Sequence, residues 1–455
     1  MQNNILNAIL LAKEIRSQLK EKLIMANKIC VSLSLNIPGY PKTSLEIKNF
    51  FEIIHSELIF YLKARLIELD NKSLLSDEAG DYFLASINSH LSAKDIKLLC
   101  ESFEGNHKLG RFIDVDITDE NGNYISSGKA KPCFYCNTYS AINCMRAKRH
   151  NFDELREFQL KEILNYIAQK NKISICKDLA SKALRAILYE ISLTPKPGLV
   201  DFSNSGTHKD MDYFTFLDSS SAISLYFQDI SELGFSFENS LSDALPKIRE
   251  IGLQMENKMF GATKGVNTQK GNIFLMGIAL FCSAFIKSKQ GIFNLEQFSQ
   301  ISQALGKHLM DEFDISTENK THGQKCVEKY GKEVAGGARL EVASGFKTSI
   351  KFGLSVFNNV DLNELNQSAK QDMLQNALLS LMANNNDTNI LFRSNFETLS
   401  EFKELALKTL SSKIAEEKAL KFQELMYFCY NKKISPGGSA DLLAIAIFLN
   451  FINKK

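Results

Sequence analysis

The sequence has no apolar run long enough to cross a membrane. Its longest candidate, residues 273–286, is shorter than the roughly 20 residues that a spanning helix requires, and it contains Gly277 and Ser283. A buried core helix is expected there. The N-terminal segment, residues 1–16, has neither a basic start nor a cleavage site, which excludes a secretory signal peptide. We therefore expect a cytoplasmic protein in which the nine cysteines are reduced.

The sequence also lacks a strong charge of either sign. Its 54 basic and 52 acidic residues give a net charge of +2, so the composition offers no field that would attract nucleic acid or a membrane surface. Neither is expected as a partner. We find no clear repeat and no low-complexity tract. At 455 residues the chain is too long for one ordinary core, so two or three domains are expected.

The first third of the chain has the mixed pattern of an α+β domain. Short stretches of alternating apolar and polar residues predict strands, and longer stretches with apolar residues at helical spacing predict helices. An Asn-Gly pair at 121–122 predicts a hairpin. The predicted helices cover residues 3–28 and 43–69, and the predicted strands cover residues 31–37, 113–117 and 124–126.

Long helical patterns dominate from about residue 152. The charged stretch 148–171 is helical as well, so the junction is expected to be a helix and not a flexible linker. The predicted fold class is multidomain, with an N-terminal α+β domain over residues 1–164 and a larger all-α helical domain over residues 165–455.

Two carboxylates lie on one face of the predicted strand 113–117. Asp114 and Asp116 are two residues apart, so both project to the same side and can reach the same magnesium ions, as in nucleotidyl and phosphoryl transferases. Arg111 beside them suits a phosphate. The alternative is a pair of solvent-facing acids on an edge strand. Upstream, the turn of residues 36–42 holds Lys42 at a strand end, where it meets either an anion or water.

Four potential metal ligands follow within residues 133–150. Cys133, Cys136, Cys144 and His150 have a spacing compatible with a Cys3His zinc site in a reduced compartment. Unliganded cysteines beside a helix-surface histidine are an alternative of equal weight.

Five turn segments in the second domain place Gly and Pro residues beside acids, amides and lysines. Their number within one helical domain favours a shared polar cavity between helices over five unrelated turns. The segment 263–271 places lysines near the N-terminus of a predicted helix, which suits a phosphate. A lone His322 is more often structural than catalytic. The segments are residues 190–212, 263–271, 336–341, 381–393 and 435–441.

These segments together resemble a known family. PKPGLVD with the following GTHKDMD, TKGVNTQKG, GARLE, DTN with a later arginine, and SPGGSADLLA resemble triphosphoribosyl-dephospho-coenzyme A synthase over roughly residues 170–455. NIPGYPK, GRFIDVD and the cysteine pattern resemble the citrate lyase holo-acyl-carrier-protein synthase over about residues 1–160. The two activities are successive steps of one pathway, so the chain resembles the fused, bifunctional enzyme.

The resemblance implies that the second domain joins ATP to 3'-dephospho-coenzyme A and releases adenine, with magnesium holding the triphosphate. The family often has histidine where this chain has Gln269, so no proton-transfer role is assigned there. Acid–base or metal roles are expected for Glu190, Asp210, Asp212 and Asp387, the last two as magnesium ligands. Nucleotide contacts are expected from Lys196, Lys264, Asn267, Lys270, Arg339, Asn389, Arg393 and Asp441.

For the first domain the resemblance implies transfer of the phosphoribosyl-dephospho-coenzyme A group to a serine of the citrate lyase acyl carrier protein, the gamma subunit, with release of pyrophosphate. Asp114 and Asp116 would carry magnesium, and Arg111 and Lys42 would contact the nucleotide. Two alternatives stay open. The same chemistry could serve malonate decarboxylase, or the first domain could be only a zinc-dependent adaptor that docks the carrier.

Overall fold

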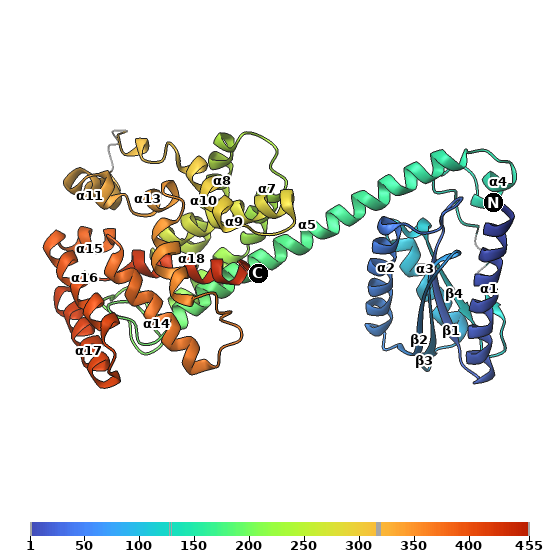
Figure 1. Ribbon diagram of the computed structural model, residues 1–455, viewed down its shortest axis with the longest axis horizontal. Coiled ribbons are helices and arrows are strands. Elements are labelled where there is room, and N and C mark those ends of the chain that lie inside the picture. The colour runs from blue at the N-terminus through green and yellow to red at the C-terminus, as the bar shows by residue number, and fades with distance from the viewer. Residues whose placement is uncertain (1, 127, 129, 315–319, 454–455) are drawn as a thin grey trace. The chain divides into compact units, whose positions relative to one another are not determined.

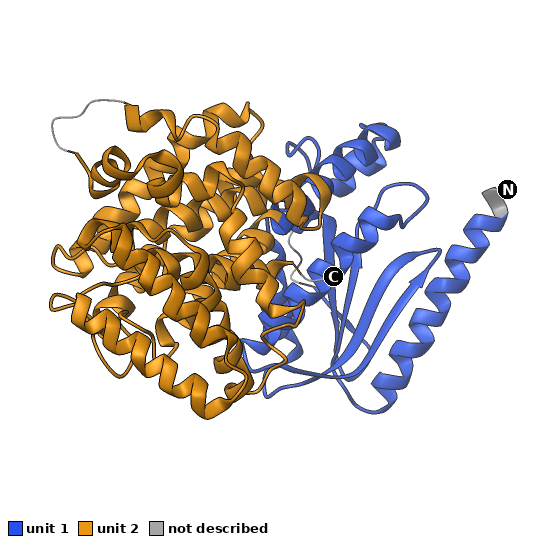
Figure 2. Ribbon diagram, turned by 60° about the vertical axis from the view of Figure 1, so that its left-hand side comes forward, with its two compact units in different colours: residues 1–171 blue, residues 172–455 orange. Residues whose placement is uncertain are grey.

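The computed structural model describes residues 2–126, 128, 130–314 and 320–453. The chain divides into two compact units, Met1–Asn171 and Lys172–Lys455 (Figure 1, Figure 2). The first unit is a five-stranded sheet with helices and the second is helical, which confirms the predicted fold class. Helix α5, Phe152–Ser192, continues without a break from one unit into the other, as expected of a helical junction.

The sheet of unit 1 is antiparallel, with the strand order β2-β3-β1-β4-β5. Its strands are β1 Cys30–Leu35, β2 Glu68–Asp77, β3 Gly80–Asn88, β4 Ile113–Thr118 and β5 Tyr124–Ile125. Its helices, besides the start of α5, are α1 Gln2–Met25, α2 Leu45–Lys63, α3 Ala93–Asn106 and α4 Ala141–Arg146. The helices and strands predicted for this part of the chain are confirmed, with shifted ends.

Helices cover both faces of this sheet (Figure 1). The face that carries Val31, Leu33 and Val115 packs against α2 and α3 in the main core of the unit. The other face, with Cys30 and Leu84, packs against α1. Because side chains alternate along a strand, Asp114 and Asp116 lie on the face opposite to Val115.

Helix α3 closes the edge of the sheet beside β4. The short β5 leaves the outer edge of Val115 without a strand partner. The side chain of Lys97 donates a hydrogen bond to the Val115 carbonyl oxygen at 2.7 Å, and the Val115 N–H donates one to Glu104 Oε1 at 2.7 Å. The buried side chains of Lys97 and Glu104 thus supply the hydrogen bonds that the backbone of Val115 would otherwise lack at this edge.

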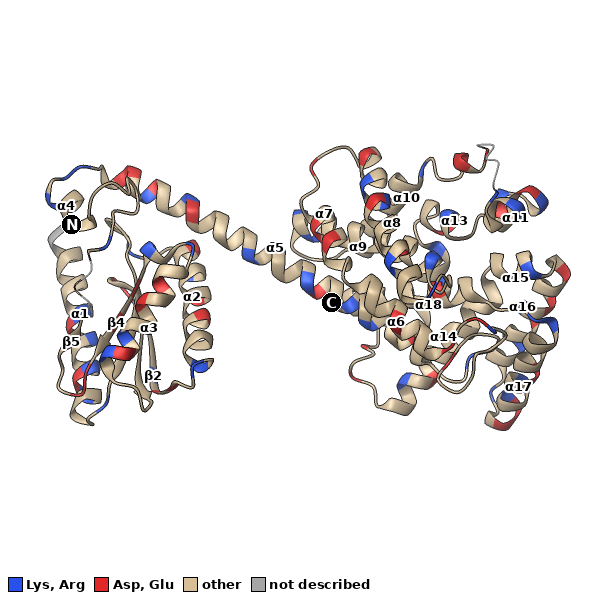
Figure 3. Ribbon diagram, turned by 180° about the vertical axis from the view of Figure 1, so that it is seen from behind, with Lys and Arg blue, Asp and Glu red and all other residues tan. Residues whose placement is uncertain are grey.

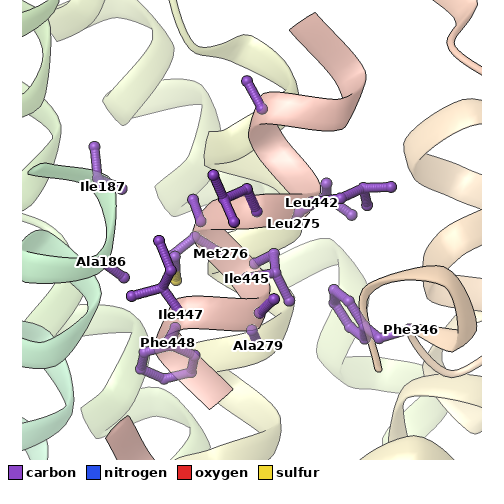
Figure 4. Packing of buried hydrophobic residues seen from close by; sticks show 14 of the residues in the cluster. Ala186, Ile187, Leu275, Met276, Ala279, Phe346, Leu442, Ile445, Ile447 and Phe448 are labelled. Atoms are coloured by element: carbon purple, nitrogen blue, oxygen red, sulfur yellow. The ribbon is translucent and has the colours of Figure 1, made fainter. Parts of the chain in front are cut away.

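Unit 2 is built around two apolar helices, α9 Lys270–Gln290 and α18 Gly437–Ile452. Their side chains pack together, with Ile187 of α5 and Phe346 nearby (Figure 4). By length and composition α9 could span a membrane, so the prediction that no apolar run reaches that length is wrong. Most of α9 is buried inside the unit, as predicted for a core helix. The remaining α-helices of unit 2 are α6 Tyr213–Ser224, α7 Phe227–Phe235, α8 Ala244–Ala262, α10 Leu295–Gly306, α11 His322–Tyr330, α12 Lys332–Ala335, α13 Gly337–Ala343, α14 Gln367–Asn384, α15 Thr388–Arg393, α16 Phe396–Ser411 and α17 Ala415–Lys432.

The predicted turn segments fall at the starts of helices in this unit, ahead of α6, α9, α13, α15 and α18. Helix starts leave backbone N–H groups without partners inside the helix, so they are suited to anions and to acidic caps. Basic and acidic side chains are interspersed along the helices of both units (Figure 3).

Candidate functional site

A cavity of about 750 Å³ lies in unit 2, and all five predicted turn segments contribute to its wall. Eight of the residues expected to act there line it. They are Glu190, Lys196, Asp210, Asn267, Lys270, Asn389, Arg393 and Asp441. The prediction that these segments share one cavity is therefore confirmed.

Glu190 and Lys196 form a buried ion pair in the wall of this cavity. Lys196 Nζ lies 2.7 Å from Glu190 Oε1 and donates a second hydrogen bond to the Glu190 carbonyl oxygen at 2.9 Å. Asp201 fixes the backbone of Lys196, since its Oδ2 accepts the Lys196 N–H at 2.9 Å. The Glu190 carboxylate therefore lies beside the cavity together with its counter-charge.

Asp441 differs from the other acids that line the cavity, because the described residues offer its carboxyl group no partner, whereas Glu190, Asp210 and Glu341 each have one. It makes no hydrogen bond or ion pair with the described residues. A Cβ atom on Gly271, at the start of α9, would lie 2.2 Å from Asp441 Oδ2, so the carboxyl group of Asp441 packs directly against this glycine. Burial, and then the charges of Glu190 and Asp387, raise the pKa of Asp441 well above its usual value. This carboxyl group is therefore suited to take up a proton.

Asp387 lies beneath the cavity and does not line it. Its Oδ1 accepts the Asn389 N–H at 3.0 Å as the N-cap of α15, and its Oδ2 accepts the Ser439 N–H at 2.8 Å and the Ser439 hydroxyl at 3.0 Å. Burial raises the pKa of Asp387, and these hydrogen bonds oppose that shift. The carboxylate thus joins the starts of α15 and α18, which carry Asn389 and Asp441.

Three other predicted residues lie outside the cavity. Asp212 is exposed and caps α6 through a reciprocal pair of hydrogen bonds with Thr215. Lys264 is exposed in the turn before α9. Arg339 lines a neighbouring cavity, where its Nε lies 3.3 Å from Glu312 Oε2.

Sequence reasoning assigned no role to several other residues of the wall. His208 Nε2 lies 2.9 Å from the Ser435 hydroxyl, and burial, aided by the charge of Arg393, lowers the pKa of His208. The buried oxygens Gln269 Oε1 and Asn272 Oδ1 have no hydrogen-bond partner among the described residues. Polar oxygens in this state favour a ligand that offers donors or a cation. The sequence alone does not show that these two amide oxygens are buried without partners, and this observation is what marks Gln269 and Asn272 as candidate ligand contacts.

Unit 1 brings its predicted acids into a network of lysines. Lys131 Nζ lies 2.8 Å from Glu104 Oε2 and 3.4 Å from Asp114 Oδ1, and Lys97 Nζ lies 3.6 Å from Asp116 Oδ1. Asp114 and Asp116 remain nearly half exposed, on one face of β4. Burial raises the pKa of Glu104. Glu104, Lys97 and Lys131 are the residues here to which sequence reasoning assigned no role.

The predicted phosphate-binding residues of unit 1 are fixed by backbone contacts. Arg111 Nε donates to the Pro132 carbonyl oxygen at 2.9 Å. Lys42 Nζ donates to the Ile37 carbonyl oxygen at 2.6 Å. Burial lowers the pKa of Lys42, and the charges of Lys13 and Arg156 lower it further. Three basic side chains, Lys13, Lys42 and Arg156, therefore gather at the turn 36–42.

The four predicted metal ligands of unit 1 come together. One ligand atom from each of Cys133, Cys136, Cys144 and His150 lies within 4.8 Å of the others, and the sulfurs of Cys136 and Cys144 are 3.6 Å apart. His150 Nε2 is buried without a hydrogen-bond partner among the described residues. Backbone N–H groups of Thr138 and Tyr139 lower the pKa of Cys136, which favours the thiolate that zinc binds.

Comparisons with known proteins divide the chain near the boundary between the two units, at residues 171 and 172. Residues 4–166 match the family model CitX, apo-citrate lyase phosphoribosyl-dephospho-CoA transferase, and residues 176–455 match CitG, ATP:dephospho-CoA triphosphoribosyl transferase. The chain is 30% identical to Protein CitXG of Leuconostoc mesenteroides subsp. cremoris, over 94% of this chain and 93% of that protein. It is 28% identical to Protein CitXG of Haemophilus influenzae, over 97% and 95% of the two chains. A 2-(5''-triphosphoribosyl)-3'-dephosphocoenzyme-A synthase of Haemophilus ducreyi is 34% identical, over 68% of this chain and 97% of its own.

Proposed function

The chain belongs to the CitXG family, in which the apo-citrate lyase transferase is fused to the triphosphoribosyl-dephospho-CoA synthase, and on this premise we propose how its two units work. It makes 2'-(5''-triphosphoribosyl)-3'-dephospho-CoA from ATP and 3'-dephospho-CoA, with release of adenine. It then transfers the phosphoribosyl-dephospho-CoA group to the citrate lyase acyl carrier protein, with release of pyrophosphate. The match over residues 4–166 favours citrate lyase over malonate decarboxylase as the source of the carrier.

The synthase reaction takes place in the 750 Å³ cavity of unit 2. The single observation that supports this assignment is the convergence of five separate turn segments on one cavity with an unpaired carboxylate, Asp441. There the ribose 2'-hydroxyl of dephospho-CoA attacks C1' of ATP, the bond between C1' and the adenine nitrogen breaks, and adenine leaves with the proton that the hydroxyl gives up. Asp441 accepts the hydroxyl proton, because its pKa is raised and its carboxyl group is free of partners among the described residues, whereas the Glu190 carboxylate is paired with Lys196. Glu190 faces the positive charge that develops on the ribose ring.

Magnesium fits the same cavity. Asp210, Gln269 and Asn272 offer carboxylate and amide oxygens, the ligands that magnesium prefers, and the two amide oxygens have no partner among the described residues. When bound, the ion would neutralise charge on the triphosphate. Lys270 and Arg393 contact the phosphates. Asp387 acts as a positioning residue for Asn389 and Asp441.

The synthase function is tested by measuring released adenine with liquid chromatography. Adenine should appear only when ATP, magnesium and dephospho-CoA are all present, and no release from the complete mixture would refute the function.

The transferase reaction takes place on the face of β4 that carries Asp114 and Asp116. A serine hydroxyl of the carrier, the gamma subunit of citrate lyase, attacks the α-phosphate of the intermediate and pyrophosphate leaves. The two carboxylates are the oxygen ligands that fit magnesium here, since they lie on one face and stay accessible. Arg111 and Lys131 contact the phosphates, while Lys42 attracts the nucleotide. We place both reactions in the cytoplasm, where ATP is available and thiols stay reduced.

The cysteine cluster would hold one structural zinc ion, with Cys133, Cys136, Cys144 and His150 as its ligands. Lys131 and Pro132, the partners of Asp114 and Arg111, directly precede Cys133, so a bound ion would stabilise the transferase site through this segment. Cys136→Ser is expected to remove the bound zinc and lower carrier loading by at least about tenfold, because ligand loss frees this loop. Metal analysis of the purified chain and a loading assay check this.

The matched control is Cys30→Ala, a buried cysteine of unit 1 outside the cluster. It should keep one zinc per chain and normal loading. Zinc content that is unchanged in Cys136→Ser would exclude the metal site. A chain that docks the carrier but releases no pyrophosphate would support the adaptor alternative instead.

A further inference from the structure

A second cavity of about 460 Å³ adjoins the first in unit 2. It lies between α8, α9 and the segments 312–313 and 335–339. Apolar side chains such as Ile248, Leu253, Phe274 and Phe313 form much of its wall. The two cavities share the residues Lys270, Gly271, Gly337, Ala338 and Thr388. A ligand longer than one nucleotide can therefore extend from the first cavity into the second.

The two cavities differ in the chemistry of their walls. Among the described residues, no asparagine or glutamine lines the second cavity. Amide side chains form a large part of the first, namely Asn267, Gln269, Asn272, Asn384, Asn385, Asn386 and Asn389. Nucleobases are recognised through donor and acceptor pairs that amides supply, whereas aliphatic chains are bound by apolar contact. The bases of the two substrates thus belong in the first cavity.

One rim of the second cavity carries an excess of positive charge. Arg249 Nη2 lies 2.6 Å from Glu312 Oε1, and Arg339 Nε lies 3.3 Å from Glu312 Oε2, so one carboxylate serves two guanidinium groups. At the boundary, Lys270 Nζ lies 2.8 Å from Glu256 Oε2. Three cations thus face two carboxylates, which suits an anionic group at the junction of the cavities.

We propose that the second cavity binds the pantetheine arm of dephospho-CoA and so selects this acceptor over other nucleotides. This inference rests on the proposed synthase function of the first cavity. With the acceptor ribose beside Asp441, the 5'-diphosphate of dephospho-CoA crosses the boundary near Lys270 and Arg339, and the gem-dimethyl and amide chain lies along the apolar wall. ATP has no such arm, so it does not occupy this cavity.

Gly252 of α8 allows the proposal to be tested by filling the cavity. It lines the second cavity only, and a Cβ atom there meets nothing within 4 Å. Gly252→Leu places an aliphatic side chain in the space, and Gly252→Ala is the matched control for the backbone change. We expect Gly252→Leu to raise the KM for dephospho-CoA by at least about tenfold, with the KM for ATP unchanged. Gly252→Ala, which adds only a methyl group, should raise this KM far less than Gly252→Leu.

ADP, which lacks the arm, separates the proposal from the synthase function itself. Adenine release with saturating dephospho-CoA reports the function, and the preference for dephospho-CoA over ADP as acceptor reports the arm site. Gly252→Leu should lower that preference by at least about tenfold, from kcat/KM values. Equal losses with both acceptors, a higher KM for ATP, or no change would overturn the proposal.

A second measurement on the wild-type chain covers the case in which Gly252→Leu does not fold. Pantetheine 4'-phosphate, which carries the arm without the nucleoside, should inhibit adenine release competitively against dephospho-CoA and not against ATP. Competition against ATP, or no inhibition at millimolar concentration, would overturn the assignment.

Discussion

Asp441→Asn is expected to lower adenine release by about 10³-fold and to leave carrier loading from the purified intermediate unchanged. The carboxylate faces the cavity without a counter-charge, and its raised pKa suits a base, whereas an amide cannot accept the 2'-hydroxyl proton. Stopped assays of adenine release and of carrier loading, run on the same preparation, check the expected loss and the expected lack of change. A variant that retains a tenth of the activity would remove Asp441 from the mechanism.

The same variant should be more stable than the wild type at neutral pH. A raised carboxyl pKa means that the folded chain binds this proton more tightly than the unfolded chain does. The stability from this group is complete below the unfolded pKa of about 4 and is lost as the pH rises through the folded pKa. The amide that replaces the carboxyl group does not ionise, so the gain in Tm should grow as the pH rises above about 4 and should shrink in acid.

Asp387→Asn provides the contrast that separates a positioning acid from a catalytic one. Its oxygens accept hydrogen bonds from the Asn389 and Ser439 N–H groups, and an amide nitrogen in place of one oxygen would face a donor. The buried N–H left without a partner costs about 1–3 kcal/mol, so Tm should fall. Equal Tm shifts in Asp387→Asn and Asp441→Asn would contradict this division of roles.

Asp114→Asn is expected to lower carrier loading by at least about 10²-fold without changing adenine release. Asp114 is nearly half exposed and on the same face of β4 as Asp116, so its replacement removes the proposed magnesium ligand rather than a buried contact. The readout is the mass gain of the carrier when purified intermediate is supplied.

Asp70→Asn is the matched control for that experiment. Asp70 is an exposed acid on β2, at the opposite edge of the same sheet. Its loading rate should equal that of the wild type. If loading survives in Asp114→Asn, or is lost equally in Asp70→Asn, the transferase site lies elsewhere.

The sequence predicted the cavity of unit 2 better than the roles of single residues within it. Gly and Pro positions mark turns by local backbone preference, so the five segments could be located without a structure. Asp212, Asp387 and Asp441 look alike in sequence, as acids at helix starts. Only the packing separates them, since one is an exposed cap, one is buried beneath the wall and one faces the cavity.

In unit 1, the sequence has no clear signal for β2, β3 or α3. Residues 80–87 of β3 are buried on both faces, so the alternation that identifies a half-exposed strand is missing. Lys97 and Glu104 of α3 could not be linked to Asp114 and Asp116, because that contact depends on α3 covering the edge of β4. The cysteine cluster was predictable, because its ligands are close in sequence.

The mass of the citrate lyase acyl carrier protein after incubation tests the central claim most directly. With this chain, ATP, magnesium and dephospho-CoA present, the apo-carrier should gain the mass of one phosphoribosyl-dephospho-CoA group while adenine and pyrophosphate are released. Leaving out dephospho-CoA should abolish the gain. An apo-carrier whose mass stays unchanged in the complete mixture, with the chain folded, would contradict the account.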